Sequence, residues 1–276
     1  LLDNWYFADP VNQRGQMEYT NGYTIDRWRS YVGTPLVTLT ADGIQLTAGD
    51  WGQPISQAAL VPAVYTCSVL LTGNKLITLT MDTTDGVARS QQVVDQETGF
   101  VLSFAYKWTT DAHLFYLNSN SSTNKAVAAK LELCPIQTLA HQNADGAWVL
   151  NDPPPNKALE LLKCQRYMFV VENVSGTNPG VGWSIVNDDT TIAAAVPAPV
   201  AMRIRPAVIM LGSWFLLGYG LNFSFEAAAH IIGTHGYSQN TISIAIQGFS
   251  GLQSGRAASL IANNDPAAKI IFDANL

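Results

Sequence analysis

The sequence predicts an all-β protein with an N-terminal jelly-roll β-sandwich, one short junction helix and a smaller C-terminal β-sandwich. Short runs that alternate with period two recur along the chain, and turn residues separate them. Charged residues make up 13% of the 276 residues, so neutral polar groups must fill the outward strand positions. Only one segment has helical spacing, and it follows a run of three prolines.

The N-terminal strands are expected in pairs that tight turns connect. Asp42-Gly43 supplies the positive φ angles of a hairpin turn, and Gly73-Asn74 and Asp85-Gly86 mark later turns. Within 99–108 the bulky residues occupy the even positions, which predicts one bulky face. Strands at this density without helices between them indicate a jelly roll. We predict strands at 36–40, 44–47, 65–71, 76–81, 99–108, 113–117 and 126–133.

A helix is predicted over 156–168, at the junction of a first domain (1–170) and a second (171–276). Asn156 is a suitable N-cap, and Glu160 complements the helix dipole in the first turns. Leu161 and Leu162 belong to a mainly apolar face at helical spacing. We therefore expect this leucine face to pack on the N-terminal sandwich.

The second domain is poor in charge and rich in glycine. Between residues 176 and 275 it carries nine acidic or basic residues. So little charge predicts that its surface is buried against copies of the same chain, as an oligomerisation or tip domain. Residues 176–182 form a Gly/Pro-rich connector, and the prolines in 192–200 favour an edge strand or extended rim. Further strands are predicted at 167–171, 207–217, 221–227, 241–246 and 270–272.

Composition also excludes several classes of partner. The net charge is −6 and the basic residues form no stripe, which argues against nucleic acid and anionic membrane surfaces. The longest apolar stretch, 207–217, is too short to span a bilayer. Three widely spaced cysteines without a C-x-x-C pair argue against structural zinc, and we expect them to be reduced and buried. The chain starts at Leu1 without Met, so we expect it to begin inside a longer product.

Seven segments carry a resemblance that covers nearly the whole chain in order: 1–7 (LLDNWYF), 10–15 (PVNQRG), 23–28 (YTIDRW), 130–133 (KLEL), 160–167 (ELLKCQRY), 199–206 (PVAMRIRP) and 271–276 (IFDANL). They resemble bacteriophage and prophage tail-fibre or head-fibre receptor-binding proteins. The resemblance implies a carbohydrate-binding-module-like jelly roll, a smaller β domain and a homotrimeric virion appendage. Two features depart from the family: the C-terminal half is unusually apolar, and no collagen-like or coiled-coil shaft is present.

The candidate ligand residues are aromatic. Flat rings suit the apolar face of a pyranose, and neighbouring Asn and Asp side chains suit its hydroxyl groups. The alternative is that these rings form an inward-facing stripe of the core. With scattered charges, we expect stacking and neutral hydrogen bonds rather than ion pairing with acidic sugars. The candidates are Trp51, Tyr106, Trp108 and Tyr116, with Asp111, Asn118 and Asn120 nearby in sequence.

Other motifs have simple structural explanations. Asp26-Arg27-Trp28 could hold a ligand, but Trp28 in the core and Asp26 paired with Arg27 or a backbone amide explain the same residues. Residues 82–86 lack the full oxygen-ligand pattern of a calcium loop. His230 and His235 have the wrong spacing for joint ligation on one strand face or helix face. We therefore expect no metal and no cofactor.

The resemblance thus implies a phage virion fibre or appendage subunit, and we expect it to adhere to host-surface or mucosal glycans. Its expected partners are copies of itself, most simply in a trimer, other virion proteins and a host glycan, and its expected location is the virion surface. A purely structural decoration or appendage protein without its own ligand is the alternative. A polysaccharide depolymerase ranks third, since no catalytic motif is present, and we expect no enzymatic activity.

Overall fold

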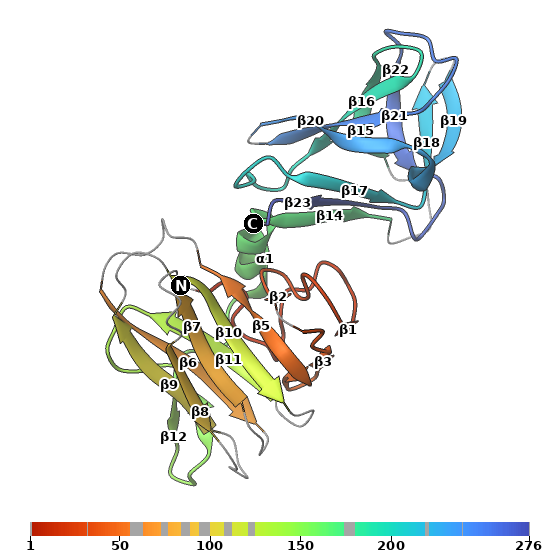
Figure 1. Cartoon of the computed structure of the whole chain (residues 1–276). Helices are drawn as coiled ribbons and strands as arrows, with labels where there is room; N and C mark the ends of the chain where they lie inside the picture. Colours follow the sequence, from red (N-terminus) through yellow and green to blue (C-terminus); the bar gives the residue numbers. More distant parts are fainter. Residues whose placement is uncertain are drawn as a thin grey trace. The chain divides into compact units, whose positions relative to one another are not determined.

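The chain divides into two compact units, described here from a computed structural model (Figure 1). Unit 1 is Leu1–Leu161 and unit 2 is Leu162–Leu276, whereas the sequence placed the division at residue 170. The structure describes residues 2–31, 33–55, 63–72, 77–83, 89–93, 100–107, 112–120, 125–173, 180–218, 221–238 and 240–275. The predicted turns at Gly73-Asn74 and Asp85-Gly86 lie outside these residues.

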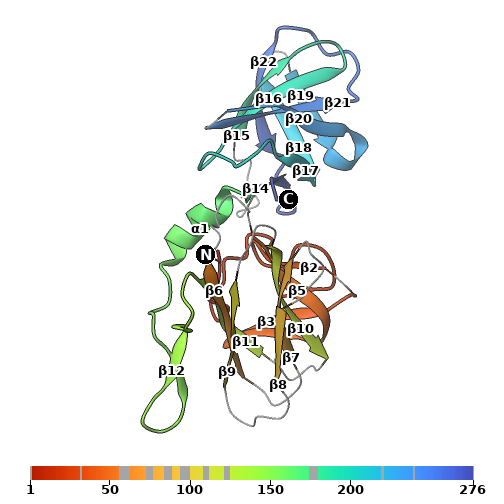
Figure 2. The ribbon, with the colours of Figure 1, turned by 60° about the vertical axis from the view of Figure 1, so that its left-hand side comes forward.

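Unit 1 is a β-sandwich, as predicted (Figures 1 and 2). Its two main sheets contain β1 (Glu18–Tyr19), β2 (Arg29–Ser30), β3 (Val37–Thr40), β4 (Gly43–Leu46), β5 (Ala48–Pro54), β6 (Val64–Thr72), β7 (Ile77–Thr83), β8 (Arg89–Val93), β9 (Phe100–Lys107), β10 (Ala112–Asn120) and β11 (Lys125–Glu132). The six-stranded sheet has the order β1-β3-β4-β11-β6-β9, and the five-stranded sheet has the order β2-β5-β10-β7-β8. The predicted hairpin at Asp42-Gly43 is present as β3–β4. By contrast, β6 and β7 lie in different sheets, so the chain crosses the sandwich between them.

The core of unit 1 lies between these two sheets. One sheet contributes side chains such as Ile44 and Val69, and the other contributes Trp51 and Phe115. Trp51 stacks on Trp28 with 4.5 Å between ring centroids and 22° between ring planes. Burial of several large aromatic rings supplies much of the hydrophobic stabilisation of this sandwich.

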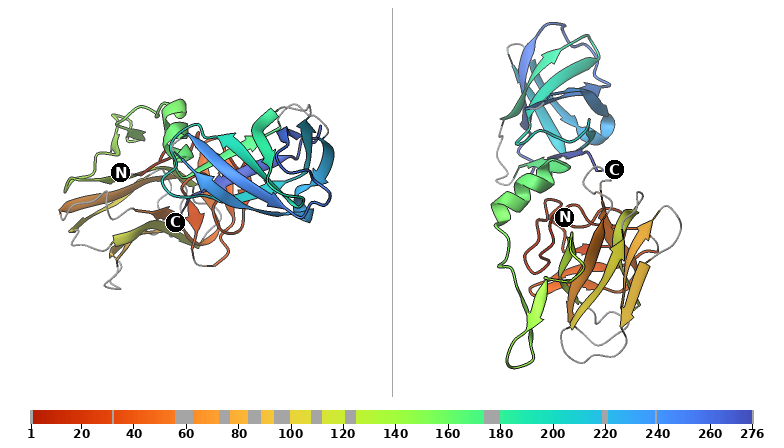
Figure 3. Two further views of the ribbon diagram at one scale, coloured as in Figure 1. Left: turned by 90° about the horizontal axis from the view of Figure 1, so that it is seen from above. Right: turned by 90° about the vertical axis from the view of Figure 1, so that its left-hand side faces the viewer.

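A short hairpin covers the outer face of the six-stranded sheet. It consists of β12 (Ala140–Gln142) and β13 (Trp148–Leu150), and it lies along one side of unit 1 (Figures 2 and 3). Leu139 and Trp148 pack with Leu70 of β6 and Ala128 of β11, forming a second small cluster. The outer face of the five-stranded sheet has no such cover among the described residues.

Asn4 joins three distant segments of unit 1. It is buried and adopts a left-handed backbone with φ of 54°. Its side-chain amide donates to Val11 O at 2.8 Å and to Asp26 O at 2.9 Å, and its Oδ1 accepts from Val11 N at 2.7 Å. Its backbone N–H donates to the Glu160 carboxylate at 2.9 Å. Every polar group of the Asn4 side chain is therefore satisfied without water.

Helix α1 (Lys157–Gln165) begins as predicted but packs on a different face. Asn156 Oδ1 accepts from Ala158 N at 3.0 Å and from Leu159 N at 3.2 Å, which confirms the N-cap. Leu162 is 44% exposed, whereas Glu160 and Cys164 are buried. The predicted leucine face is therefore only half right: Leu161 is partly buried and lines a cavity with Val11, whereas Leu162 faces solvent. The bond from Asn4 turns the Glu160 side of the helix inward instead.

Unit 2 is a second sandwich. Its strands are β14 (Met168–Glu172), β15 (Gly180–Val186), β16 (Thr191–Pro197), β17 (Ala207–Leu211), β18 (Ser213–Gly218), β19 (Leu221–Glu226), β20 (Ile231–Tyr237), β21 (Thr241–Gln247), β22 (Ala257–Ala262) and β23 (Lys269–Asp273), with a 3-10 turn at Ala227–Ala229. The three-stranded sheet has the order β14-β23-β17, and the seven-stranded sheet has the order β19-β18-β22-β15-β16-β21-β20. The edge-strand prediction for 192–200 was wrong, since β16 lies inside the larger sheet and Pro197 occupies its last position.

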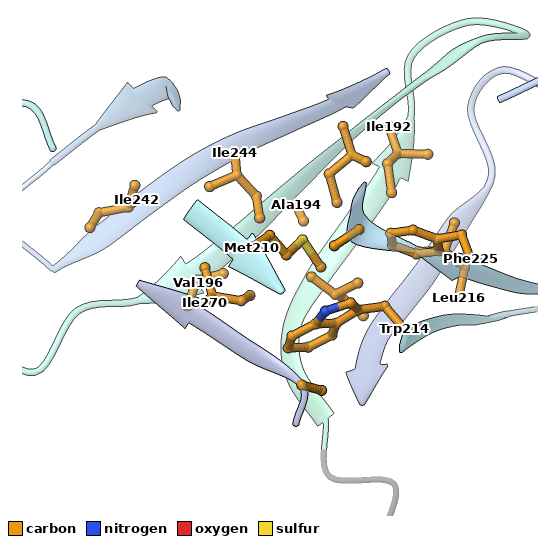
Figure 4. Close-up of a cluster of buried hydrophobic side chains, with 14 of the residues drawn as sticks. Ile192, Ala194, Val196, Met210, Trp214, Leu216, Phe225, Ile242, Ile244 and Ile270 are labelled. Carbon is orange, nitrogen blue, oxygen red and sulfur yellow. The ribbon is translucent and has the colours of Figure 1, made fainter. Parts of the chain in front are cut away.

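The core of unit 2 is built from alternate residues of both sheets (Figure 4). Ile192, Ala194 and Val196 of β16 all point inward, with polar or small residues between them. Trp214 lies beside Met210 of the smaller sheet in the close-up. The alternation buries the apolar side chains at the inward positions, whereas large apolar side chains at outward positions, such as Trp183 and Ile185, stay exposed.

Gly212 divides what the sequence predicted as one strand over 207–217. β17 and β18 flank it and belong to different sheets. Its φ is +77°, and an added Cβ would lie 2.8 Å from Ala268 Cα. The adjacent Ser213 N–H donates to Asp265 Oδ2 at 2.7 Å, and the hydrogen bonds from Ser213 and Ala267 lower the pKa of Asp265. The chain therefore changes sheets at a position that only glycine fits.

Gly212→Ala should lower the free energy of unfolding by about 2–4 kcal/mol, through the left-handed backbone and the overlap with Ala268. Gly251→Ala is the matched control, because Gly251 has φ of +74° but open space around its Cβ position. The control should lose about 1–2 kcal/mol. Urea unfolding measures both; equal losses would show that the close approach at Gly212 is unimportant.

Leu162→Ala should cost less than about 1 kcal/mol, because the side chain is already largely in water. Ile244→Ala is the comparison within the same unit: Ile244 is fully buried and should cost about 2–5 kcal/mol. Thermal and urea unfolding of both variants test this. A loss of several kcal/mol at Leu162 would mean that the helix packs on its leucine face after all.

Candidate functional site

Trp51, a predicted sugar-stacking residue, belongs to the core. It is fully buried, packs edge-on against Phe7 at 5.1 Å and stacks on Trp28. Its indole N–H donates to Thr24 Oγ1 at 2.8 Å, so its one polar group is also satisfied internally. For Trp51 the structure therefore favours the alternative of an inward aromatic stripe.

Three other candidates lie wholly or partly outside the described structure. Trp108 and Asp111 are not among the described residues. The backbone of Tyr106 pairs with that of Tyr65 in the six-stranded sheet, but the structure does not describe the Tyr106 side chain. The stacking role of these residues therefore stays a prediction.

Tyr116 lies on the outer face of the five-stranded sheet. It is partly exposed, whereas its strand neighbours Phe115 and Leu117 are fully buried. Its cross-strand partner is Gly52, where an added Cβ would lie 2.5 Å from Tyr116 Cβ. No side chain therefore separates the Tyr116 ring from the next position along this row.

Asn118 lies two residues further along β10 and so shares the face of Tyr116. It is exposed and pairs across strands with Asp50, whose carboxylate accepts a hydrogen bond from the Asn118 amide. Asn118 Oδ1 and the second Asp50 oxygen have no hydrogen bond to another described residue. The face thus offers oxygen acceptors beside an aromatic ring.

Arg29 is the residue of this face that the sequence did not predict. It pairs with Gly52 from the edge strand β2, so Arg29, Gly52 and Tyr116 form one row across three strands. The sequence signal was weak, because β2 contains only two residues. The spacing Arg29-x-Tyr31, with two polar or aromatic side chains two residues apart, is the one available clue.

The Asp26-Arg27-Trp28 motif is structural. Trp28 is fully buried, and Asp26 accepts from Gln13 N at 3.1 Å. Arg27 is buried with φ of 73°, and its Nε donates to Asp3 Oδ2 at 3.2 Å. The motif is therefore structural, as predicted: of the two predicted partners of Asp26, the structure shows a backbone amide, while Arg27 pairs with Asp3.

Three open cavities are lined by described residues. The first, of about 470 Å³, lies in unit 2 and includes Glu172, Phe169 and Pro197. The second, of about 440 Å³, lies between helix α1 and the loop at Val11 and is almost entirely apolar. The third, of about 350 Å³, lies beside Trp183 in unit 2. Together they contain one carboxylate, that of Glu172.

No group of three or more metal-ligating side chains occurs within the described residues. The His230 ring packs on that of Phe249 with 4.3 Å between centroids and 32° between ring planes, and its Nδ1 lies 3.0 Å from Gln247 O. Most of the possible calcium loop at 82–86 lies outside the described residues. Cys67, Cys134 and Cys164 form no disulfide, and Cys67 and Cys164 are buried as expected, whereas Cys134 is partly exposed, contrary to the prediction. Burial raises the pKa of the Cys67 thiol.

The outer face of the seven-stranded sheet in unit 2 is apolar. Its seven strands contain a single acidic or basic residue, Glu226, at the end of edge strand β19. Trp183 projects from the central strand β15 and is 77% exposed. Its cross-strand neighbours are Ala195 and Ser259, so the indole stands above small side chains.

Among the described residues, no helix has the length and apolar character needed to cross a membrane.

No protein-family model matches the chain. No curated protein matches it either. Among solved structures, it is distantly similar to the N-terminal CBM22-1–CBM22-2 tandem domain of Xyn10C from Paenibacillus barcinonensis, with a TM-score of 0.31, 12% identity, and 93% of this chain and 94% of that chain covered. It is also similar to a cycloisomaltooligosaccharide glucanotransferase from Paenibacillus sp. complexed with cycloisomaltoheptaose, with a TM-score of 0.25, 10% identity, and 98% of this chain and 46% of that chain covered. Similarities this distant carry no argument, so the fold assignment rests on the two antiparallel sandwiches themselves.

Proposed function

We propose that the chain is a bacteriophage virion fibre or appendage subunit that adheres to host-surface or mucosal glycans. The observation that carries this proposal is the partly exposed Tyr116 ring beside the Asn118–Asp50 pair, on a sheet face without cover among the described residues. The seven fibre-like segments of the sequence support the virion location. The site is the outer face of the five-stranded sheet in unit 1.

The chemistry of this face suits a sugar. The C–H face of a pyranose packs on a flat aromatic ring, and hydroxyl groups donate to carboxylate and amide oxygens. The hydrogen bond from Asn118 holds Asp50 in place, so both acceptors are ordered before a ligand arrives. One ring contributes about 1 kcal/mol beyond area burial, so a single site binds weakly.

Binding rather than catalysis is proposed. Glycoside hydrolysis needs two carboxyl groups about 5–10 Å apart in one groove. The three cavities described above share one carboxylate between them. Asp50 is also engaged by Asn118, which suits a group that orients a hydroxyl rather than one that transfers a proton.

Unit 2 is proposed to assemble the subunits, most simply into a trimer attached to other virion proteins. The support is the outer face of its seven-stranded sheet, with Trp183, Ile185, Leu217 and Ile231 all substantially exposed. An apolar face of this kind on a β-sheet is typical of a protein interface. Several weak glycan sites in one assembly raise the apparent affinity by about 10²–10⁴.

A purely structural virion protein is the second candidate. The same apolar face of unit 2 favours it, because that face needs a protein partner and no glycan. The two candidates differ in unit 1: a structural subunit has no use for an ordered acceptor pair beside an aromatic ring.

Tyr116→Ala should reduce glycan binding about tenfold, because the stacking ring is lost. Tyr116→Phe is the control that keeps the ring and removes only the hydroxyl group, and it should retain most of the binding. A glycan array followed by calorimetry on the assembled protein measures both, with circular dichroism to check the fold. Unchanged binding by folded Tyr116→Ala, or no binding by the wild type, favours the structural candidate.

Trp183→Ser should weaken self-association and shift the assembly toward monomers at micromolar concentration, since the most exposed large ring of the face is removed. Ile136→Ser is the control, because Ile136 is 70% exposed but belongs to unit 1 and not to the seven-stranded sheet. Light scattering with size-exclusion chromatography gives the mass. A wild-type chain that is already monomeric would contradict the oligomer.

A further inference from the structure

Arg29 occupies an unusual position at the edge of the candidate glycan face. It belongs to β2, one of the two edge strands of the five-stranded sheet. Gly52 separates it from Tyr116 in the same row without contributing a side chain. Two strand spacings correspond to about 10 Å, so one oligosaccharide can reach from the Tyr116 ring to Arg29.

Two tyrosine rings hold the guanidinium group in place. Arg29 Cζ lies 4.6 Å from the centroid of the Tyr31 ring and 5.3 Å from that of the Tyr23 ring. Arg14 lies 5.3 Å from the Tyr23 ring as well. Cation–π contacts with both rings fix the orientation of the planar group before any ligand binds.

The hydrogen-bonding capacity of Arg29 is not used within the described structure. Its Nε is buried and has no hydrogen-bond partner, and the hydroxyl group of neighbouring Tyr31 is in the same state. A buried charged donor without an acceptor is costly, so such groups normally have one.

The two other arginines of this region do have carboxylate partners. Arg27 Nε lies 3.2 Å from Asp3 Oδ2, and Arg14 Nη1 lies 3.8 Å from Asp26 Oδ1. Asp50 is the acid nearest in register to Arg29, two residues from Gly52, but its carboxylate binds Asn118. Among described residues, Arg29 therefore remains without an anion in a chain whose net charge is −6.

We infer that the glycan bound by unit 1 carries a carboxylate, and that Arg29 binds this group at the edge of the sheet. Arg29 has this role only if unit 1 binds glycans, as proposed above. A planar guanidinium offers paired donors that match a sugar carboxylate. The expectation from sequence, that stacking and neutral hydrogen bonds supply all the affinity, is replaced by stacking on Tyr116 together with an ion pair at Arg29.

The test uses a hexuronic-acid oligosaccharide and its carboxyl-reduced form as paired probes. The full-length wild type should bind the acidic probe roughly 10–100-fold more tightly. Arg29→Gln should bind both probes equally, at the affinity of the wild type for the neutral form. Lys125→Gln is the matched control, because it removes one positive charge from the other sheet and should change neither affinity. Tyr116→Ala should weaken the binding of both probes.

A measurement on the wild type covers the case in which Arg29→Gln does not fold. Raising the salt concentration from about 0.05 to 0.5 M should weaken binding of the acidic probe and leave binding of the neutral probe unchanged. Equal wild-type affinity for the two probes, without salt dependence, overturns the role of Arg29 and leaves the glycan proposal intact. If neither probe nor any arrayed glycan binds the wild type, the proposed function itself fails.

Discussion

The buried amide of Asn4 is the interaction on which the arrangement of unit 1 depends. The side-chain amide connects the N-terminal segment at Val11 with the loop at Asp26, and the backbone N–H of Asn4 binds helix α1 at Glu160, all through hydrogen bonds of 2.7–2.9 Å. Loss of this side chain would leave several buried donors and acceptors unpaired, each at a cost of about 1–3 kcal/mol. Because Trp28 also donates to Asn4 O, the same residue positions the start of β2 and with it Arg29.

The two sheets of unit 1 differ in what covers them, and this difference determines where a ligand can bind. The outer face of the six-stranded sheet packs against the β12–β13 hairpin through Leu139 and Trp148. On the other sheet, the outer face keeps Tyr116, Asn118 and Asp50 accessible to different degrees. The exposed face of unit 2 is apolar and almost free of charge, so it suits a protein partner rather than a sugar. One chain thus carries two faces with different chemistry, one in each unit.

The strands were predictable from the sequence because period-two alternation and turn residues are local signals. The all-β class, the β3–β4 hairpin and the N-cap at Asn156 follow directly from them. The errors arose where a distant partner decided the outcome. Glu160 is buried because its carboxylate accepts a hydrogen bond from the backbone N–H of Asn4, 156 residues away. Helical spacing alone cannot predict such a contact. Trp51 follows Gly49-Asp50 and precedes Gly52, a stretch without the apolar alternation that would assign its face. Arg29 lies on a strand too short to have a pattern.

The three free cysteines have a practical consequence. Cys67 lies in the core of unit 1 and Cys164 lies in unit 2, and both are almost completely shielded from solvent. Alkylating reagents attack the thiolate, which burial disfavours at Cys67, so the folded units protect these two sulfur atoms. Cys134 is partly accessible and labels first. The rates at which the other two cysteines become labelled therefore report the opening of each unit separately, and the natural sequence already contains a probe for each.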